Sequence, residues 1–272
     1  IVLFATKGLN YGVDFRGGAE IQVKFGDKLD LNELRGSLKK AGFSSSSVQS
    51  MGEDADNEYM IKVAAGEKNL NAVTDAITKM LATDFASIKP DIQKTDIVGP
   101  KAGEQLRISG FQAMVWALLM IMIYIALRFD YKYSPGAIVA LIHDVVIIIG
   151  IFVLMEKEFS LQIVGALLAV IGYSVNDTVV VYDRVREHVE KDGSKGLRGL
   201  INIALNETLS RTMLTSITTL IVAGIMFAMG GGVIHDFFFA IVLGVFIGTY
   251  SSLFVAAPTI LFFDKFSGNK AA

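Results

Sequence analysis

One apolar stretch of the sequence, residues 161–182, contains polar side chains that can exchange a proton. Ser174, Asp177 and Thr178 stand at positions i, i+3 and i+4, so a helix presents all three on one face. A charged side chain at the centre of a membrane helix costs about 2.5 to 3.5 kcal/mol or more, which marks it as a functional candidate. A lone buried carboxylate must pair with a cation or hold a proton, so Asp177 is a candidate charge switch. The alternative is a structural carboxylate that hydrogen-bonds a neighbouring helix.

A candidate cation for Asp177 lies at the start of the next apolar stretch. Arg211, Thr215 and Thr218 or Thr219 share one helix face. Asp177 and Arg211 are equally distant from position 194 in the intervening link, so an antiparallel helix pair places them at similar height. The spacing therefore predicts that the carboxylate and the guanidinium meet. The alternative for Arg211 is a side chain that extends to the lipid headgroups.

A second acidic site is predicted in the stretch 135–155. Asp144 lies about 13 Å along a helix that starts at residue 135, deep enough in a membrane for a second proton-relay residue. The adjacent His143 points about 100° away around the helix, so the two side chains need not act together. A structural pair that lines a helix bundle is the alternative.

Small residues recur every four positions in the last apolar stretch. They form a continuous ridge, which is typical of close contact between membrane helices. The ridge predicts packing against another helix, either of this chain or of a partner. Its members are Ala240, Gly244, Gly248, Ser252 and Ala256.

The composition of the 272 residues places these sites in a membrane protein. The chain is 52% hydrophobic and only 19% charged, with a mean hydropathy of +0.50. Its 25 basic and 27 acidic residues nearly cancel, so the sequence predicts no binding of nucleic acid. It contains no cysteine, which excludes disulfides and thiolate metal sites. With no water-accessible catalytic set or metal cluster, we expect a protein that is not an enzyme and has no cofactor.

Five apolar stretches are long enough to span a lipid bilayer as helices. Lysine and arginine gather in the links 128–134 and 183–211 and after residue 263, so these parts are predicted to be cytoplasmic. The apolar residues 1–7 are interpreted as the end of a truncated first transmembrane helix, or alternatively as a frayed strand. The predicted bundle covers 108–263 and the cytoplasmic tail 264–272. The five stretches are 108–127, 135–155, 161–182, 212–229 and 237–263.

Residues 8–107 alternate between two hydrophobic periodicities, which predicts a separate domain outside the cytoplasm. Strand-like patterns are expected at 20–25, 48–51, 59–63 and 86–98, the last carrying Ile88, Ile92 and Ile97. Helical patterns are expected at 29–41 and 70–81. The order βαββαβ is that of an α+β, ferredoxin-like domain with a four-stranded sheet. The predicted fold class is therefore an α-helical polytopic membrane protein with a ferredoxin-like extracytoplasmic domain.

Several motifs resemble the SecD/SecF family of protein-export membrane subunits, within the RND superfamily. The resemblance covers nearly the whole chain, and the outer segment of only about a hundred residues favours the SecF side, since SecD is expected to carry a larger one. The chain departs from the family in lacking most of a first transmembrane helix. The motifs are GVDFRGG (12–18), DIVGP (96–100), HD (143–144), IGYSVNDTVVVYDRVRE (171–187) and LSRT (209–212).

The resemblance implies a multi-pass protein of the bacterial inner membrane, with residues 8–107 periplasmic and the C-terminus cytoplasmic. It implies pairing with SecD, association with the SecYEG channel, and an unfolded preprotein as substrate. The family's proton-passage Asp and Arg fall on Asp177 and Arg211, with Asn176 and Thr178 as tuning neighbours. Protonation of Asp177 would weaken its attraction to Arg211 and move the outer domain. The alternatives are a scaffold that only stabilises the translocon and an RND-type exporter of small molecules.

Overall fold

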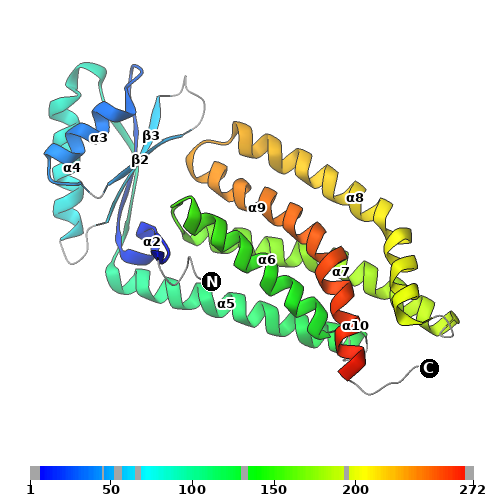
Figure 1. Ribbon diagram of the computed structural model, residues 1–272. Coiled ribbons are helices and arrows are strands. Elements are labelled where there is room, and N and C mark those ends of the chain that lie inside the picture. The colour runs from blue at the N-terminus through cyan, green and yellow to red at the C-terminus, as the bar shows by residue number, and fades with distance from the viewer. Residues whose placement is uncertain are drawn as a thin grey trace.

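The computed structural model describes residues 7–44, 46–51, 57–64, 69–129, 134–192 and 196–266. The predicted end of a first transmembrane helix (1–7) and the predicted tail (264–272) fall almost entirely outside these residues. The described chain has two parts, a small sheet domain and a bundle of long helices (Figure 1). This arrangement confirms the predicted fold class.

The sheet domain has the predicted order βαββαβ. Its four antiparallel strands are arranged β2-β3-β1-β4. Two helices pack on one face, which Figure 1 shows on the side away from the bundle, and their buried Leu34, Leu38 and Ile77 meet Ile21 and Ile61 of the sheet. The opposite face of the sheet is turned toward the bundle. The elements are β1 (Gly18–Lys24), α3 (Leu31–Lys40), β2 (Ser47–Met51), β3 (Glu58–Ala64), α4 (Leu70–Asp84) and β4 (Asp91–Val98).

The last strand is shorter than predicted. A 3-10 turn occupies Ala86–Ile88, and β4 begins only at Asp91. Lys89 has a φ of 47°, and Pro90 has no N–H to donate to a ladder, so the chain bends before the strand starts. Ile92 and Ile97 lie on β4 as predicted, although Ile97 is 43% exposed. Ile88 packs on the core from the turn, so the prediction that it lies on the strand is wrong.

The bundle contains the predicted five spans, each long and apolar enough to cross a membrane. The last span is not one continuous α-helix, because a π-helical segment at Ser252–Ala256 separates α9 from α10. The wider turn carries Ser252 and Ala256, both fully buried. The helices are α5 (Pro100–Arg128), α6 (Ser134–Leu154), α7 (Leu161–Asp192), α8 (Leu197–Met229), α9 (Gly232–Ser251) and α10 (Ala257–Phe266).

Two helices extend far beyond their predicted apolar stretches. Of the segment 183–211, which was predicted as a link, residues 183–192 continue α7 and residues 197–211 belong to α8. Its charges are accommodated by pairing, since Arg184 and His188 of α7 both contact Glu207 of α8. Between the helices, Val185 and Ile201 are buried in one apolar cluster. The charged link is therefore a helical hairpin that continues the bundle.

Candidate functional site

Asp144 is the most fully satisfied polar group in the described part of the bundle. It lies on α6 with 1% of its surface exposed. Ser174 Oγ of α7 and Ser251 Oγ of α9 both donate to its Oδ2 atom, at 2.6 and 2.8 Å. His143 Nδ1 lies 3.0 Å from its Oδ1 atom, so the two neighbours are in contact, as in the alternative of a structural pair. The two side chains turn toward each other although their Cβ atoms diverge. Asp144 thereby joins three helices.

Asp177 lies on the same buried face of α7 as Ser174 and Thr178, and is 3% exposed. Its environment differs from that of Asp144, because its Oδ2 atom is buried and has no hydrogen-bond partner among the described residues. Thr178 Oγ1, one residue further, lies 3.0 Å from Ser252 Oγ at the start of the π segment. The bundle therefore contains one buried carboxylate that hydroxyl groups hold, Asp144 of α6, and one whose Oδ2 atom has no such partner among the described residues, Asp177 of α7.

Arg211 does not meet Asp177 as predicted. Its charge is close enough to act on the Asp177 carboxyl group, but the described residues include no ion pair between the two. Arg211 is exposed on α8, whose buried positions in this region are Thr208, Thr212 and Ser216. One helical residue corresponds to about 100° of rotation, so the neighbour of a buried residue points away from the core. The sequence spacing therefore predicted the position of Arg211 along α8 correctly, but not the direction in which its side chain points.

The other two predicted members of the site also lie outside the buried cluster. Asn176 is exposed on α7. It is the residue before Asp177, so its side chain points about 100° away around the helix axis. Thr215 is half-buried, and its Oγ1 atom donates to the Arg211 carbonyl at 3.1 Å, within its own helix. Asn176, Arg211 and Thr215 therefore do not contact Asp177 through side-chain hydrogen bonds within the described residues.

A set of hydroxyl groups that the sequence reading missed joins three helices beside these carboxylates. Tyr173 Oη of α7 donates to Ser216 Oγ of α8 at 3.3 Å, and Ser216 Oγ lies 2.7 Å from Thr249 Oγ1 of α9. Thr212 is fully buried, and its Oγ1 atom has no partner among the described residues. The four-residue spacing of Thr208, Thr212 and Ser216 was the available signal, since it marks one polar face of α8.

The predicted ridge of small residues lies against α7 of this same chain. A Cβ atom added to Gly244 would come within 2.1 Å of Val170, and one added to Gly248 would come within 3.1 Å of Ser174. Ser252 continues the ridge and donates to the Ser174 carbonyl at 3.4 Å. The absence of side chains at these glycines lets α9 approach closely enough for its serines to reach Asp144 and Thr178.

The glycine-rich segment 12–18 connects the sheet domain to the bundle. It forms a short turn of helix, α2 (Val13–Arg16), and then enters β1. Gly17 has a φ of 79° and leaves no room for a Cβ atom beside Pro100 of α5. Gly12 donates its N–H to the Phe159 carbonyl at 2.9 Å, in the link between α6 and α7. The segment therefore holds the sheet domain against the ends of α5, α6 and α7 that lie nearest the sheet.

Comparison with protein families identifies two matches that together span most of the chain. Residues 77–265 match the family described as "Protein export membrane protein SecD/SecF, C-terminal". Residues 2–28 match the "SecD/SecF GG Motif", which includes the glycine-rich segment. Both matches agree with the motifs that carried the resemblance.

Individual relatives support the same assignment. The chain is 42% identical to "Protein translocase subunit SecF" of Thermodesulfovibrio yellowstonii, over 94% of this chain and 84% of that protein. It is 43% identical to the SecF of Magnetococcus marinus, over 100% of this chain and 88% of that protein. The crystal structure of a translocon-associated SecDF from Thermus matches with a TM-score of 0.82 at 32% identity, over 97% of this chain but only 36% of that longer one. A second SecDF structure, in a super-membrane-facing form, gives a TM-score of 0.71. The chain therefore belongs to the SecD/SecF protein-export family, among the SecF subunits of the protein translocase.

Proposed function

We propose that this chain couples proton movement to protein export, with Asp177 as the group that takes up and releases the proton. The observation that supports the proposal is the unpartnered Oδ2 atom of Asp177, buried in a membrane-spanning helix. An ionised carboxylate is costly there unless it pairs, and a protonated one is not. The Arg211 charge acts on the group without a direct bond, so proton uptake changes the attraction between α7 and α8.

Asp144 has a different role in this proposal. Its carboxylate accepts hydrogen bonds from Ser174 and Ser251. A carboxylate held in this way fixes the packing of α6, α7 and α9. Asp144 is therefore the structural carboxylate of the bundle in this proposal, and Asp177 is the group that exchanges the proton.

The partner in this proposal is a SecD-type subunit that covers an exposed face of α7. Gly165, Ala169, Gly172 and Asn176 are exposed along this face, and a Cβ atom added to either glycine would touch nothing. Such a stripe admits a closely packed helix from another chain, and the Asn176 amide gains a partner instead of facing lipid. Together, the two subunits would bind the SecYEG channel and draw an unfolded preprotein outward. The sheet domain would then lie on the outer side of a bacterial inner membrane.

The test is gradient-dependent completion of preprotein translocation in membrane vesicles that contain the chain with its partner subunits. Asp177→Asn removes the exchangeable proton while keeping the shape of the side chain, so we expect translocation that no longer responds to the gradient. Asp183→Asn is the matched control, because Asp183 is exposed on the same helix and outside the buried cluster. If the Asp177→Asn complex assembles and translocates normally, the chain is a scaffold and the proton-coupling proposal is wrong.

A further inference from the structure

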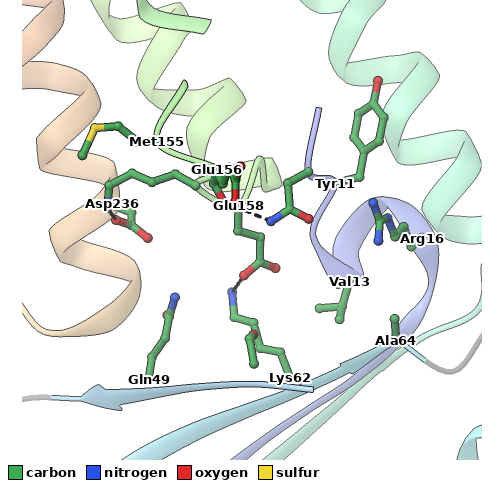
Figure 2. A pocket seen from close by; sticks show the side chains of 13 residues that line it. Tyr11, Val13, Arg16, Gln49, Lys62, Ala64, Met155, Glu156, Glu158 and Asp236 are labelled. Atoms are coloured by element: carbon green, nitrogen blue, oxygen red, sulfur yellow. Dashed lines mark hydrogen bonds and ion pairs between the residues drawn. The ribbon is translucent and has the colours of Figure 1, made fainter. Parts of the chain in front are cut away.

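A buried ion pair connects the sheet domain to the bundle. Lys62 projects from β3 on the face of the sheet that the helices α3 and α4 leave uncovered, and is only 5% exposed. Its Nζ atom lies 3.4 Å from Glu20 of β1 and 3.4 Å from Glu158 in the link between α6 and α7. Figure 2 shows Lys62 and Glu158 pointing toward each other across the space between the sheet and the helices. One lysine thus bridges both parts of the molecule.

The link that carries Glu158 is hydrogen-bonded to residues 10–12 and leads directly into α7. Phe159 donates its N–H to the Asn10 carbonyl at 2.7 Å and accepts from Gly12 at 2.9 Å. A Cβ atom on Gly12 would lie 2.6 Å from Glu158 Oε1, so a larger residue at position 12 would require this carboxylate to shift. α7, which carries Asp177, begins two residues after Phe159.

The same link is also bound to α9. Lys157 forms an ion pair with Asp236 at 2.5 Å, and its Nζ atom lies 5.0 Å from the ring centre of Phe239. A cavity of about 350 Å³ lies beside these groups and is lined by residues of the sheet, the link and α9, among them Gln49, Lys62 and Asp236. The cavity reaches from the glycine-rich segment to α9 (Figure 2). The link therefore connects the sheet to the helices whose side chains hold Asp144.

We propose that Lys62 and Glu158 form the mechanical joint through which the sheet domain follows movements of α7. The inference rests on the proposed function and adds the route by which proton exchange at Asp177 reaches the outer domain. The two residues are positioning residues and do not take part in proton transfer. We expect loss of either charge to leave the bundle assembled, because the backbone hydrogen bonds of residues 10–12 remain, but to weaken the coupling of β3 to the link.

Charge reversal tests the joint in the full chain assembled with its partner subunits. The variants are Lys62→Glu, Glu158→Lys and the two combined, which restores an ion pair with opposite polarity. The matched control is Glu58→Gln, which removes the Lys24–Glu58 pair inside the sheet domain without affecting the bundle. The readouts are hydrogen exchange of the peptides covering 58–64 and 155–161, and translocation of a preprotein.

We expect each single reversal to speed exchange in both peptides by about tenfold and to slow translocation, with recovery in the combined variant. Glu58→Gln should change neither the 155–161 peptide nor translocation. Unchanged exchange at 155–161 in both single variants would overturn the joint. So would a combined variant that recovers neither exchange nor translocation although the complex assembles.

A third comparison separates failure of the joint from failure of the proposed function. Asp177→Asn imitates the protonated carboxylate. The joint predicts that this substitution alters hydrogen exchange at 58–64 in the otherwise unchanged chain, but not in a chain that also carries Glu158→Gln. This readout does not depend on translocation. If Asp177→Asn alters exchange but not translocation, the proton-coupling proposal is wrong and the joint stands. If Asp177→Asn alters translocation but has the same effect on hydrogen exchange at 58–64 with and without Glu158→Gln, the joint is wrong.

Discussion

The Asp14 carboxylate accepts a hydrogen bond of 2.9 Å from the backbone N–H of Leu161, the first residue of α7. Asp14 belongs to the glycine-rich segment at the entrance to the sheet domain, far away in sequence. It therefore acts as the N-terminal cap of a helix to which it is not attached, and its negative charge faces the positive end of the helix dipole. The sheet domain and the helix carrying Asp177 are joined directly at this point.

Asp14→Ala should lower the free energy of unfolding by about 1 kcal/mol, because one N–H of the first turn of α7 loses its acceptor. The measurement is denaturant unfolding of the purified chain in detergent. Asp75→Ala is a suitable control, since Asp75 is exposed on α4 and caps nothing. Equal effects of the two substitutions would show that the cap contributes no stability.

The two buried aspartates should respond differently to substitution. Asp144→Ala should cost about 3 kcal/mol, because the hydroxyls of Ser174 and Ser251 lose their shared acceptor. Asp177→Asn should not lower the unfolding free energy in this way, because its Oδ2 atom accepts no hydrogen bond within the described residues. Unfolding in detergent measures both. A large loss for Asp177→Asn would mean that its carboxylate has a stabilising partner after all.

Gly244→Ala should destabilise the bundle by about 1 to 3 kcal/mol, since the new methyl group would overlap Val170. The double variant Gly244→Ala with Val170→Ala should recover part of the loss, which unfolding in detergent would reveal. Gly224→Ala is the matched control on α8, where a methyl group would touch nothing. A Gly244→Ala chain as stable as the control would contradict the close packing of α9 on α7.

Lys62 should be protected from amine-reactive labels at alkaline pH. Burial alone would lower the pKa of the Lys62 ammonium, but the charges of Glu158 and Glu20 outweigh it and raise the pKa above its ordinary value. The folded state therefore favours the charged form, which contributes stability below about pH 10.4 that is lost as the pH rises through the folded-state pKa. At about pH 9, Lys62 should react several-fold more slowly than the exposed Lys40, as peptide mass spectrometry can measure.

The control for this labelling is Glu158→Gln. Removing one carboxylate lowers the pKa of Lys62 and opens its surroundings, so its reaction should accelerate while that of Lys40 stays constant. Equal labelling of Lys62 and Lys40 in the unchanged chain would contradict the buried ion pair.

Much of the fold was predictable because its hydrophobic periods are long and regular. Five apolar stretches and the βαββαβ pattern needed no tertiary information, and the buried face of Ser174, Asp177 and Thr178 follows from helical geometry alone. The extension of α7 and α8 could not be predicted in this way. The charged residues of 183–211 are typical of a solvated link, and only the structure shows that Arg184 pairs with Glu207 across the two helices.

The candidate site was only partly predictable for a related reason. Equal sequence distances from a turn predict the height of Arg211 but not the rotation of α8 about its axis, which depends on packing along the whole helix. The joint at Lys62 was invisible in the sequence, because it depends on how two separately folded parts meet. The role of Asp14 as a helix cap was not predicted, since a cap is normally sought immediately before its helix in the sequence.

The π-helical segment Ser252–Ala256 gives the last span one residue more than a regular α-helix would use over the same length. Its Ala256 carbonyl accepts a hydrogen bond from the Tyr182 hydroxyl of α7 at 3.2 Å, so the neighbouring helix holds the wide turn in place. Deleting one residue there would close the wide turn into a regular α-helix and change the position of the carbonyl group that Tyr182 contacts. The extra residue of the last span is therefore tied to its contact with α7.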